Sequence, residues 1–280
     1  MPANLRPLST GELLDKTFTL YRLNFPLFFG IAVLPQIGLF ILVTLFQGFS
    51  FATRQTQNLA SVATLAIVTF VAALTYLVGA LVATGITQAA TTFAVSSLYL
   101  GEPASVKGAY ARVKGMIWLS VRVVFSLGFL IMLGLLLFII PGIIVLRRYS
   151  LAVPAAVLER IKTSEALKRS RHLSEGSGGR VLLVYVLMLV LVYAVAIGAG
   201  WALTLVFKAQ ALQTSFGAQV AHRFVSSLVS AVVAPVMTIA FSLLYYDQRV
   251  RKEAFDIEHM MQALQPGGAS TGAAAAGTAV

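Results

Sequence analysis

The side chains that could do chemistry in this sequence are arginines and lysines near its middle. Arg147 and Arg148 stand next to each other in an apolar stretch. Lys168, Arg169 and Arg171 follow in a short basic segment. A guanidinium group matches phosphate in a two-pronged hydrogen-bonded geometry, and basic clusters beside a membrane attract anionic lipid. These five residues are therefore candidate contacts for an anion or a lipid phosphate.

A structural interpretation competes for Arg147 and Arg148. Helical rise places them roughly 8 Å beyond the preceding turn, in the outer half of the membrane. There they would snorkel to the outer head groups or cap exposed backbone carbonyls. The sequence leaves both interpretations open.

The sequence shows no catalytic, cofactor or metal site. Its histidines, His172, His222 and His259, are scattered, and it has no cysteine. Metal-assisted hydrolysis needs a clustered set of ligands, and covalent catalysis needs a nucleophile beside a base. We therefore expect a protein that is not an enzyme and that binds no cofactor.

Composition indicates a membrane protein. Of the 280 residues, 58% are hydrophobic and only 11% are charged, against about 25% charged in a typical soluble domain. The net charge of +11 would suggest nucleic acid in a soluble protein. In a membrane protein the same excess is expected in cytoplasmic loops, so nucleic acid is not expected as a partner. The lack of cysteine fits a bacterial cytoplasmic (inner) membrane.

The apolar runs predict an all-α, polytopic membrane domain over residues 25–246. A crossing needs about 20 apolar residues. The second run is much longer but has no polar break, so we expect one long helix bent near Gly79 or Gly85. The predicted spans are residues 25–47, 59–98, 117–140, 143–158, 181–207 and 220–246.

Pro141 and Gly142 decide the predicted topology. If they form a tight turn, residues 143–158 return across the membrane and six spans result. Only three basic residues, Arg54, Lys208 and Arg223, then lie outside, and both termini are cytoplasmic. With five spans the basic residues between 160 and 180 would lie outside, against the positive-inside preference. Six spans are therefore favoured.

The weak point of this topology is the return span. Residues 143–158 cover only roughly 24 Å of helix. They also include two arginines and Pro154. A helix of this kind is expected to be buried among the other spans or to enter the membrane only part of the way.

Surface helices are expected at both ends of the membrane domain. Residues 1–24 form an amphipathic cytoplasmic helix, with Ser9 and Glu12 at the spacing of a capping box. Residues 247–264 form a second amphipathic helix with an Asp247–Arg251 pair. Residues 265–280 are a low-complexity tail that we expect to be disordered.

Similar basic helices precede three hairpins in the predicted arrangement. They begin at Ser9, at Ser105, and at Thr163 or Ser164. Each is followed by a span and a returning span. This order suggests a threefold repeat of a surface helix plus a hairpin.

A polar stripe interrupts the second apolar run. Thr84, Thr87, Gln88 and Thr91 fall on one helical face. Such stripes pack helix against helix through hydrogen bonds. The alternative is a polar cavity lined by these residues.

Three segments resemble one bacterial family. GELLDKTFTLYRLNF near the start, PAAVLE followed by EALKRSRHL in the middle, and LLYYDQRVRKEAFDIE near the end are similar to the glycerophosphoryl diester phosphodiesterase membrane domain. That family is named after proteins in which a similar membrane region is joined to a catalytic barrel. Only 34 residues (280 − 246) follow Tyr246, so we expect the barrel to be missing. The resemblance therefore implies a membrane module without its enzyme activity.

Two functions remain as hypotheses. The first is a non-catalytic membrane protein that binds anionic lipid, or a membrane or cytoplasmic partner protein, through its basic surface helices. The second is a transporter or permease for a small lipid-like solute, suggested by the mid-span prolines and the polar stripe. Transporter sites have broken helices in paired halves, whereas Pro35, Pro141 and Pro235 are unpaired in this sequence.

Overall fold

A computed structural model describes residues 7–55, 61–207 and 215–263 of the chain. This part of the chain is helical and contains no strand. The predicted tail from residue 265 lies outside the described residues. The helices are α1 (Thr10–Leu23), α2 (Phe25–Gln55), α3 (Ser61–Tyr99), α4 (Val106–Val113), α5 (Ile117–Leu137), α6 (Ile139–Tyr149), α7 (Ala152–Glu159), α8 (Thr163–Ser174), α9 (Gly178–Phe207) and α11 (Phe216–Ala263).

Six stretches of helix in this part of the chain are long and apolar enough to cross a membrane. One of them, Ile139–Glu159, combines α6 and α7. The prediction of an all-α, multi-pass membrane protein is therefore confirmed. α3 is one uninterrupted helix, as the missing polar break predicted.

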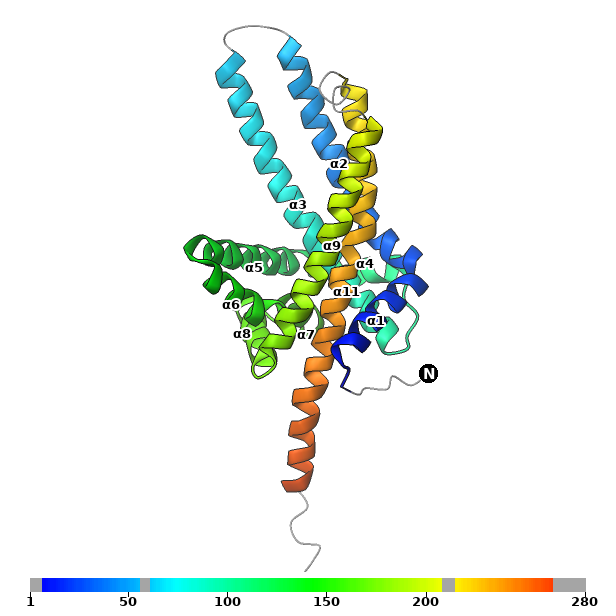
Figure 1. Cartoon of the computed structure of the whole chain (residues 1–280), viewed down its shortest axis with the longest axis vertical. Coiled ribbons are helices and arrows are strands. Elements are labelled where there is room, and N and C mark those ends of the chain that lie inside the picture. Colours follow the sequence, from blue (N-terminus) through cyan, green and yellow to red (C-terminus); the bar gives the residue numbers. More distant parts are fainter. Residues whose placement is uncertain (1–6, 56–60, 208–214, 264–280) are drawn as a thin grey trace, which may run out of the picture.

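Four helices form the long axis of the molecule. Figure 1 shows α2, α3, α9 and α11 running lengthwise, with the last turns of α2 and α9 and the first turns of α3 and α11 at the same end. α11 packs against each of the other three. It continues without a break past Tyr246 to Ala263, so the predicted boundary between a last span and a separate surface helix is wrong.

α5 and α6 form a hairpin of a different kind. Figure 1 shows α5 running across the long helices, with the hairpin tip pointing away from them. The tip is apolar and exposed, and an apolar tip is compatible with lipid rather than with water. Its exposed side chains are Leu136, Leu137, Phe138, Ile139 and Ile140.

The hairpin turn lies at Phe138 and not at the predicted Pro141–Gly142. Phe138 is extended, with φ −170° and ψ 159°. Pro141 falls in the first turn of α6, where a missing N–H costs nothing because those groups have no acceptor within the helix. Gly142 allows close packing instead, because a Cβ atom built on it would lie 3.2 Å from the backbone nitrogen of Leu135 in α5.

The predicted return span over residues 143–158 falls within the sixth apolar stretch, Ile139–Glu159, but it is not one unbroken helix, because the chain breaks at Ser150 and Leu151 into α6 and α7. Ser170 of α8 satisfies backbone groups at this break. Its hydroxyl donates to the Arg148 carbonyl at 2.9 Å and accepts from the Leu151 N–H at 3.1 Å. α7 is then buried along Ala152 to Val157, which fits the prediction of a short element enclosed by others.

The order of short helix and hairpin recurs three times along the chain, as predicted: α1 before α2–α3, α4 before α5–α6, and α8 before α9–α11. Ser9 and Glu12 form the predicted capping box, and the Ser105 hydroxyl accepts from the Gly108 N–H. The expected hydroxyl cap of α8 is wrong, because Lys162 is the cap residue. The Glu165 carboxylate accepts from its N–H at 3.3 Å.

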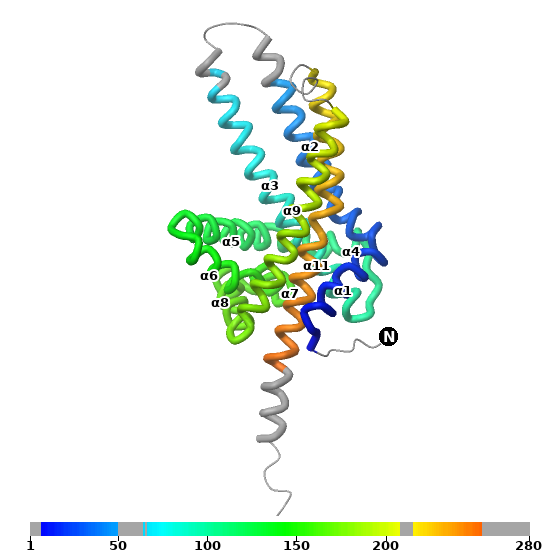
Figure 2. Tube along the Cα trace, viewed as in Figure 1, coloured from blue at the N-terminus to red at the C-terminus, as the bar shows by residue number. Residues whose placement is uncertain are grey.

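The short helices α1, α4, α7 and α8 surround the lower half of α11 in Figure 2. We call this part of the molecule the basal end. Most of the buried core lies here, and it includes Leu13, Leu151, Leu173 and Tyr245. The far ends of α3 and α9 instead carry exposed apolar side chains such as Phe70 and Leu205. Those ends are suited to lipid contact.

Candidate anion site and neighbouring polar features

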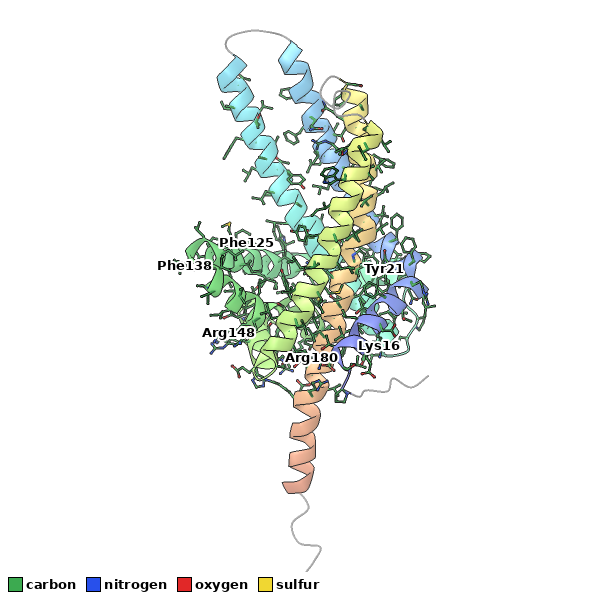
Figure 3. The ribbon with its side chains drawn as sticks, in the orientation of Figure 1. Lys16, Tyr21, Phe125, Phe138, Arg148 and Arg180 are labelled. Atoms are coloured by element: carbon green, nitrogen blue, oxygen red, sulfur yellow. The ribbon has the colours of Figure 1, made fainter. Side chains whose placement is uncertain are left out.

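Arg147, Arg148 and Arg171 line one pocket of about 270 Å³. Its walls are the end of α6, the end of α8 and the start of α9, and we call it the arginine pocket. Figure 3 places Arg148 at the edge of the basal end. The structure therefore brings together three of the five predicted anion contacts from different elements.

This placement corrects the sequence expectation for Arg147 and Arg148. They were expected in the outer half of the membrane, far from the basic segment of α8. The structure puts them beside Arg171 on α8. The reason is the direction of the α5–α6 hairpin, which points sideways and returns α6 to the basal end.

The start of α9 adds backbone donors to the arginine pocket. Gly178 and Gly179 line the pocket in its first turn, where N–H groups have no acceptor within the helix. The Ser177 hydroxyl does not cap them, because it bonds to the Gln248 side-chain oxygen at 2.5 Å. A helix start with free N–H groups and a positive dipole end favours an anion.

Ser174 also lines the pocket and is only 4% exposed. Its buried hydroxyl has no hydrogen-bond partner within the described part of the chain. Buried polar groups are nearly always paired, so an unpaired one calls for an explanation. A ligand oxygen in the pocket would supply the missing partner.

The arginines of the pocket carry little compensating negative charge. Arg171 Nε lies 3.6 Å from a Glu175 carboxylate oxygen, and both side chains are more than half exposed. Exposed pairs of this kind contribute little stability. Arg147 and Arg148 have no ion-pair partner among residues 7–55, 61–207 and 215–263. The pocket is therefore electropositive.

Lys168 and Arg169, the other two predicted contacts, do not line this pocket. Lys168 is exposed on α8. Arg169 forms ion pairs with Glu159 at 2.7 Å and with Glu253. Burial lowers the pKa of Arg169, but its hydrogen bonds with both carboxylates outweigh that effect and raise the pKa overall. The Tyr245 hydroxyl also donates to Glu159, at 2.6 Å, so Arg169 serves to hold α7, α8 and α11 together.

A second ion-pair cluster centres on Asp247, whose side chain is fully buried. Its carboxylate accepts from the Leu8 backbone N–H at 2.7 Å. Arg180 and Arg251 each place a guanidinium nitrogen 3.0 Å from the other carboxylate oxygen. Both arginines also donate to the Leu8 carbonyl at 2.6 Å. The sequence predicted only the Arg251 pair, because Leu8 and Arg180 are distant in sequence.

The polar stripe of α3 lines a cavity of about 560 Å³. Thr84, Thr87 and Gln88 face it, together with Gln36 of α2. Thr91, the fourth member of the stripe, is fully buried away from the cavity. The sequence left open whether the stripe packs against another helix or lines a cavity. Three of its four residues line a cavity.

No protein-family model, curated protein or solved structure matches the chain. The resemblance to the glycerophosphoryl diester phosphodiesterase membrane domain stays a prediction. Its segments lie in α1, α7, α8 and α11, which pack together at the basal end. Asp247, Tyr245, Glu159 and Arg169, which form the two ion-pair clusters, belong to these segments. The motif therefore has a structural role in this chain.

Proposed function

We propose that this multi-pass membrane protein binds the phosphate of an anionic lipid head group in the arginine pocket. Arg147, Arg148 and Arg171 would supply charge-assisted hydrogen bonds. The first-turn N–H groups of α9 and the Ser174 hydroxyl would supply further donors. The observation that carries the proposal is the convergence of three arginines with a buried, unpaired hydroxyl.

We further propose a non-catalytic protein in a bacterial cytoplasmic membrane, with both termini in the cytoplasm. The basal end would then face the leaflet whose anionic lipids attract basic residues. Lys107, Lys114 and Lys168 are exposed at or beside the surface helices and would add a less specific attraction. A protein partner at the same surface would compete with lipid.

The test compares two triple variants of the full chain with the same change in charge. Arg147→Gln/Arg148→Gln/Arg171→Gln removes the positive charges of the arginine pocket. Lys107→Gln/Lys114→Gln/Lys168→Gln removes the positive charges of exposed residues outside it. Juxtamembrane basic residues contribute about 1 kcal/mol each, so the first variant should lose roughly 100-fold in affinity for phosphatidylglycerol. Native mass spectrometry of the protein titrated with this lipid measures the loss.

The control variant should lose much less affinity for phosphatidylglycerol, because its lysines attract anionic lipid only through long-range electrostatics. Equal losses in both variants would contradict a defined pocket. A phosphatidylcholine titration tests whether the anionic head group matters. Competition by inorganic phosphate separates recognition of the phosphate from recognition of the whole lipid.

The cavity along α3 favours a second candidate, transport of a small lipid-like solute. A binding place among the long helices is what a transporter requires. Protein-dependent movement of a fluorescent lipid across proteoliposome membranes would test it. A rate equal to that of protein-free vesicles would exclude transport of that lipid.

A further inference from the structure

The cavity of about 560 Å³ lies within the helix bundle, apart from the arginine pocket. It is enclosed mainly by α3, α5, α9 and α11, with the ends of α6 and α7 below. Its volume falls within the range of ligand pockets, roughly 300–1,000 Å³. A cavity of this size is large enough for a ligand rather than a single water molecule.

The lining of the cavity is uncharged. Among the residues that the structure describes, it includes no Asp, Glu, Lys, Arg or His side chain. A charged group placed there would lose its hydration without gaining a counter-charge, which is costly among membrane helices. The chemistry of the wall therefore selects an uncharged ligand, unlike that of the arginine pocket.

Most polar side chains of the wall form no hydrogen bond within the described ranges; the Ser150 hydroxyl is an exception, because it donates to the Leu146 carbonyl. Thr87 is only 6% exposed, yet neither it nor Gln36, Thr84 or Gln88 forms a side-chain hydrogen bond within the described ranges. Some hydroxyls of the long helices bond to the carbonyl four residues earlier, as Thr75 does to Val71 at 2.8 Å, whereas those of Thr44 and Thr91, outside the cavity, also have no partner among the described residues. Tyr185 and Tyr193 of α9 and Thr238 of α11 likewise form no side-chain hydrogen bond in the described part of the chain. The two amide side chains of the wall lie on α2 and α3, so the ligand should carry most of its hydrogen-bonding atoms at that side.

The remaining wall is apolar and its rim is open to lipid. Leu127, Ile131, Val192 and Met237 are among the apolar lining residues. At the rim Tyr193 is 59% exposed. It lies on α9 among exposed apolar side chains such as Val190. A ligand that enters here comes from the bilayer.

We infer that this cavity binds an uncharged glyceride lipid, with its hydroxyl and ester oxygens against Thr87, Gln88 and Gln36 and an acyl chain along the apolar wall. This goes beyond anion binding at the arginine pocket, and it names a substrate class for the transport candidate while requiring only binding. If the protein binds the glyceride lipid but does not move it across the membrane, the result would therefore contradict the transport candidate and leave this inference standing.

The experiment uses the full chain in nanodiscs that contain a diacylglycerol with a diazirine on one acyl chain. Illumination should attach the probe near Thr84, Thr87 and Tyr193, as mapped by peptide mass spectrometry. Ala234→Phe and Val192→Phe each fill the cavity and should reduce labelling there. Thr87→Val/Gln88→Leu removes two hydrogen-bonding groups and should reduce it about tenfold.

Thr75→Val is the matched control, because it removes an α3 hydroxyl that already has a partner outside the cavity. Its labelling should equal that of the unaltered protein. Unlabelled dioleoylglycerol should compete with the probe in the unaltered protein, so the test does not depend on any variant folding. The inference is overturned if the competitor has no effect or if label spreads evenly over the lipid-facing helices. Equal cavity labelling by a diazirine-bearing phosphatidylglycerol would also overturn it.

Discussion

Two groups of arginines lie at the basal end of the molecule and differ in what faces them. Arg180, Arg251 and Arg169 point at buried or half-buried carboxylates that tie the segment before α1 and the helices α7, α8, α9 and α11 together. Arg147 and Arg148 have no carboxylate partner in the described part of the chain. The same residue type therefore performs two tasks. A paired arginine fixes the fold, whereas an unpaired one is free for a ligand.

The two groups also differ in how they are solvated. Asp247 is completely buried, so its pairs with Arg180 and Arg251 must offset a large cost of desolvation. Arg147 is exposed and keeps much of its hydration. Breaking the first group should therefore unfold the protein, whereas neutralising the second should leave it folded but weaken binding.

The largest expected effect comes from Asp247→Ala. The change leaves Arg180, Arg251 and the Leu8 N–H without their shared acceptor. Removing one partner of a buried ion pair costs about 3–5 kcal/mol. Thermal unfolding in detergent, followed by circular dichroism, should show a large fall in the transition temperature. Asp15→Ala, at an exposed position on α1, is the control; equal stability of the two variants would show that the buried cluster does not hold the basal end.

A smaller difference is expected between Arg169→Gln and Arg148→Gln. The first variant leaves Glu159 and Glu253 with a neutral partner and should lose about 2 kcal/mol of stability, the range for hydrogen bonds to charged groups. The second should keep its stability, since no carboxylate loses a partner. Chemical unfolding of both variants in the same detergent measures the difference. A greater loss in Arg148→Gln would reverse the assignment of the two groups.

Ser174→Ala should separate binding from folding. Its hydroxyl is buried and unpaired, so removing it should not reduce stability. If the hydroxyl bonds to a lipid phosphate, affinity for phosphatidylglycerol should fall by about 1 kcal/mol, or roughly fivefold. Ser164→Ala, at an exposed position on the same helix, should change neither quantity. Unchanged affinity in Ser174→Ala would remove this hydroxyl from the site.

Gly178→Ala should have only a small effect on stability. A Cβ atom at this position would lie 2.7 Å from the Arg147 side chain, which is exposed and can move aside. We expect a change in stability below about 0.5 kcal/mol together with a severalfold loss of phosphatidylglycerol binding, because Arg147 leaves the pocket. Gly179→Ala is the control, since nothing lies within 4 Å of its added Cβ. Equal binding by the two variants would show that the position of Arg147 is unimportant.

The sequence predicted local features better than it predicted which distant residues contact one another. Ser9 with Glu12 and Ser105 were recognised as helix caps because a cap depends on residues three positions apart. The α8 cap was missed because Lys162 carries no hydroxyl to mark it. The turn was placed at Pro141 because proline is a strong signal, although a first-turn proline is fully compatible with a helix. Phe138, the actual turn residue, carries no such signal.

The arginine pocket shows where sequence reasoning stopped. Guanidinium chemistry singled out Arg147 and Arg148, and the basic segment singled out Arg169 and Arg171 equally. Only the contacts separate them, since Arg169 meets Glu159 and Glu253 from two other helices. Ser174 was missed altogether, because a serine in a basic helix gives no sign that its hydroxyl will be buried and unpaired.

The sequence by itself determined the all-α membrane class, the apolar spans and the order of short helices and hairpins. These follow from composition and from periodicities of a few residues, which depend on the local chain alone. The tertiary structure decided the direction of the α5–α6 hairpin, the pairing of each charge and the cavity beside α3. These depend on which surfaces meet across distant parts of the chain. The direction in which α6 returns decides the surroundings of Arg147. It makes Arg147 part of a pocket with Arg171 and not an isolated charge among apolar residues.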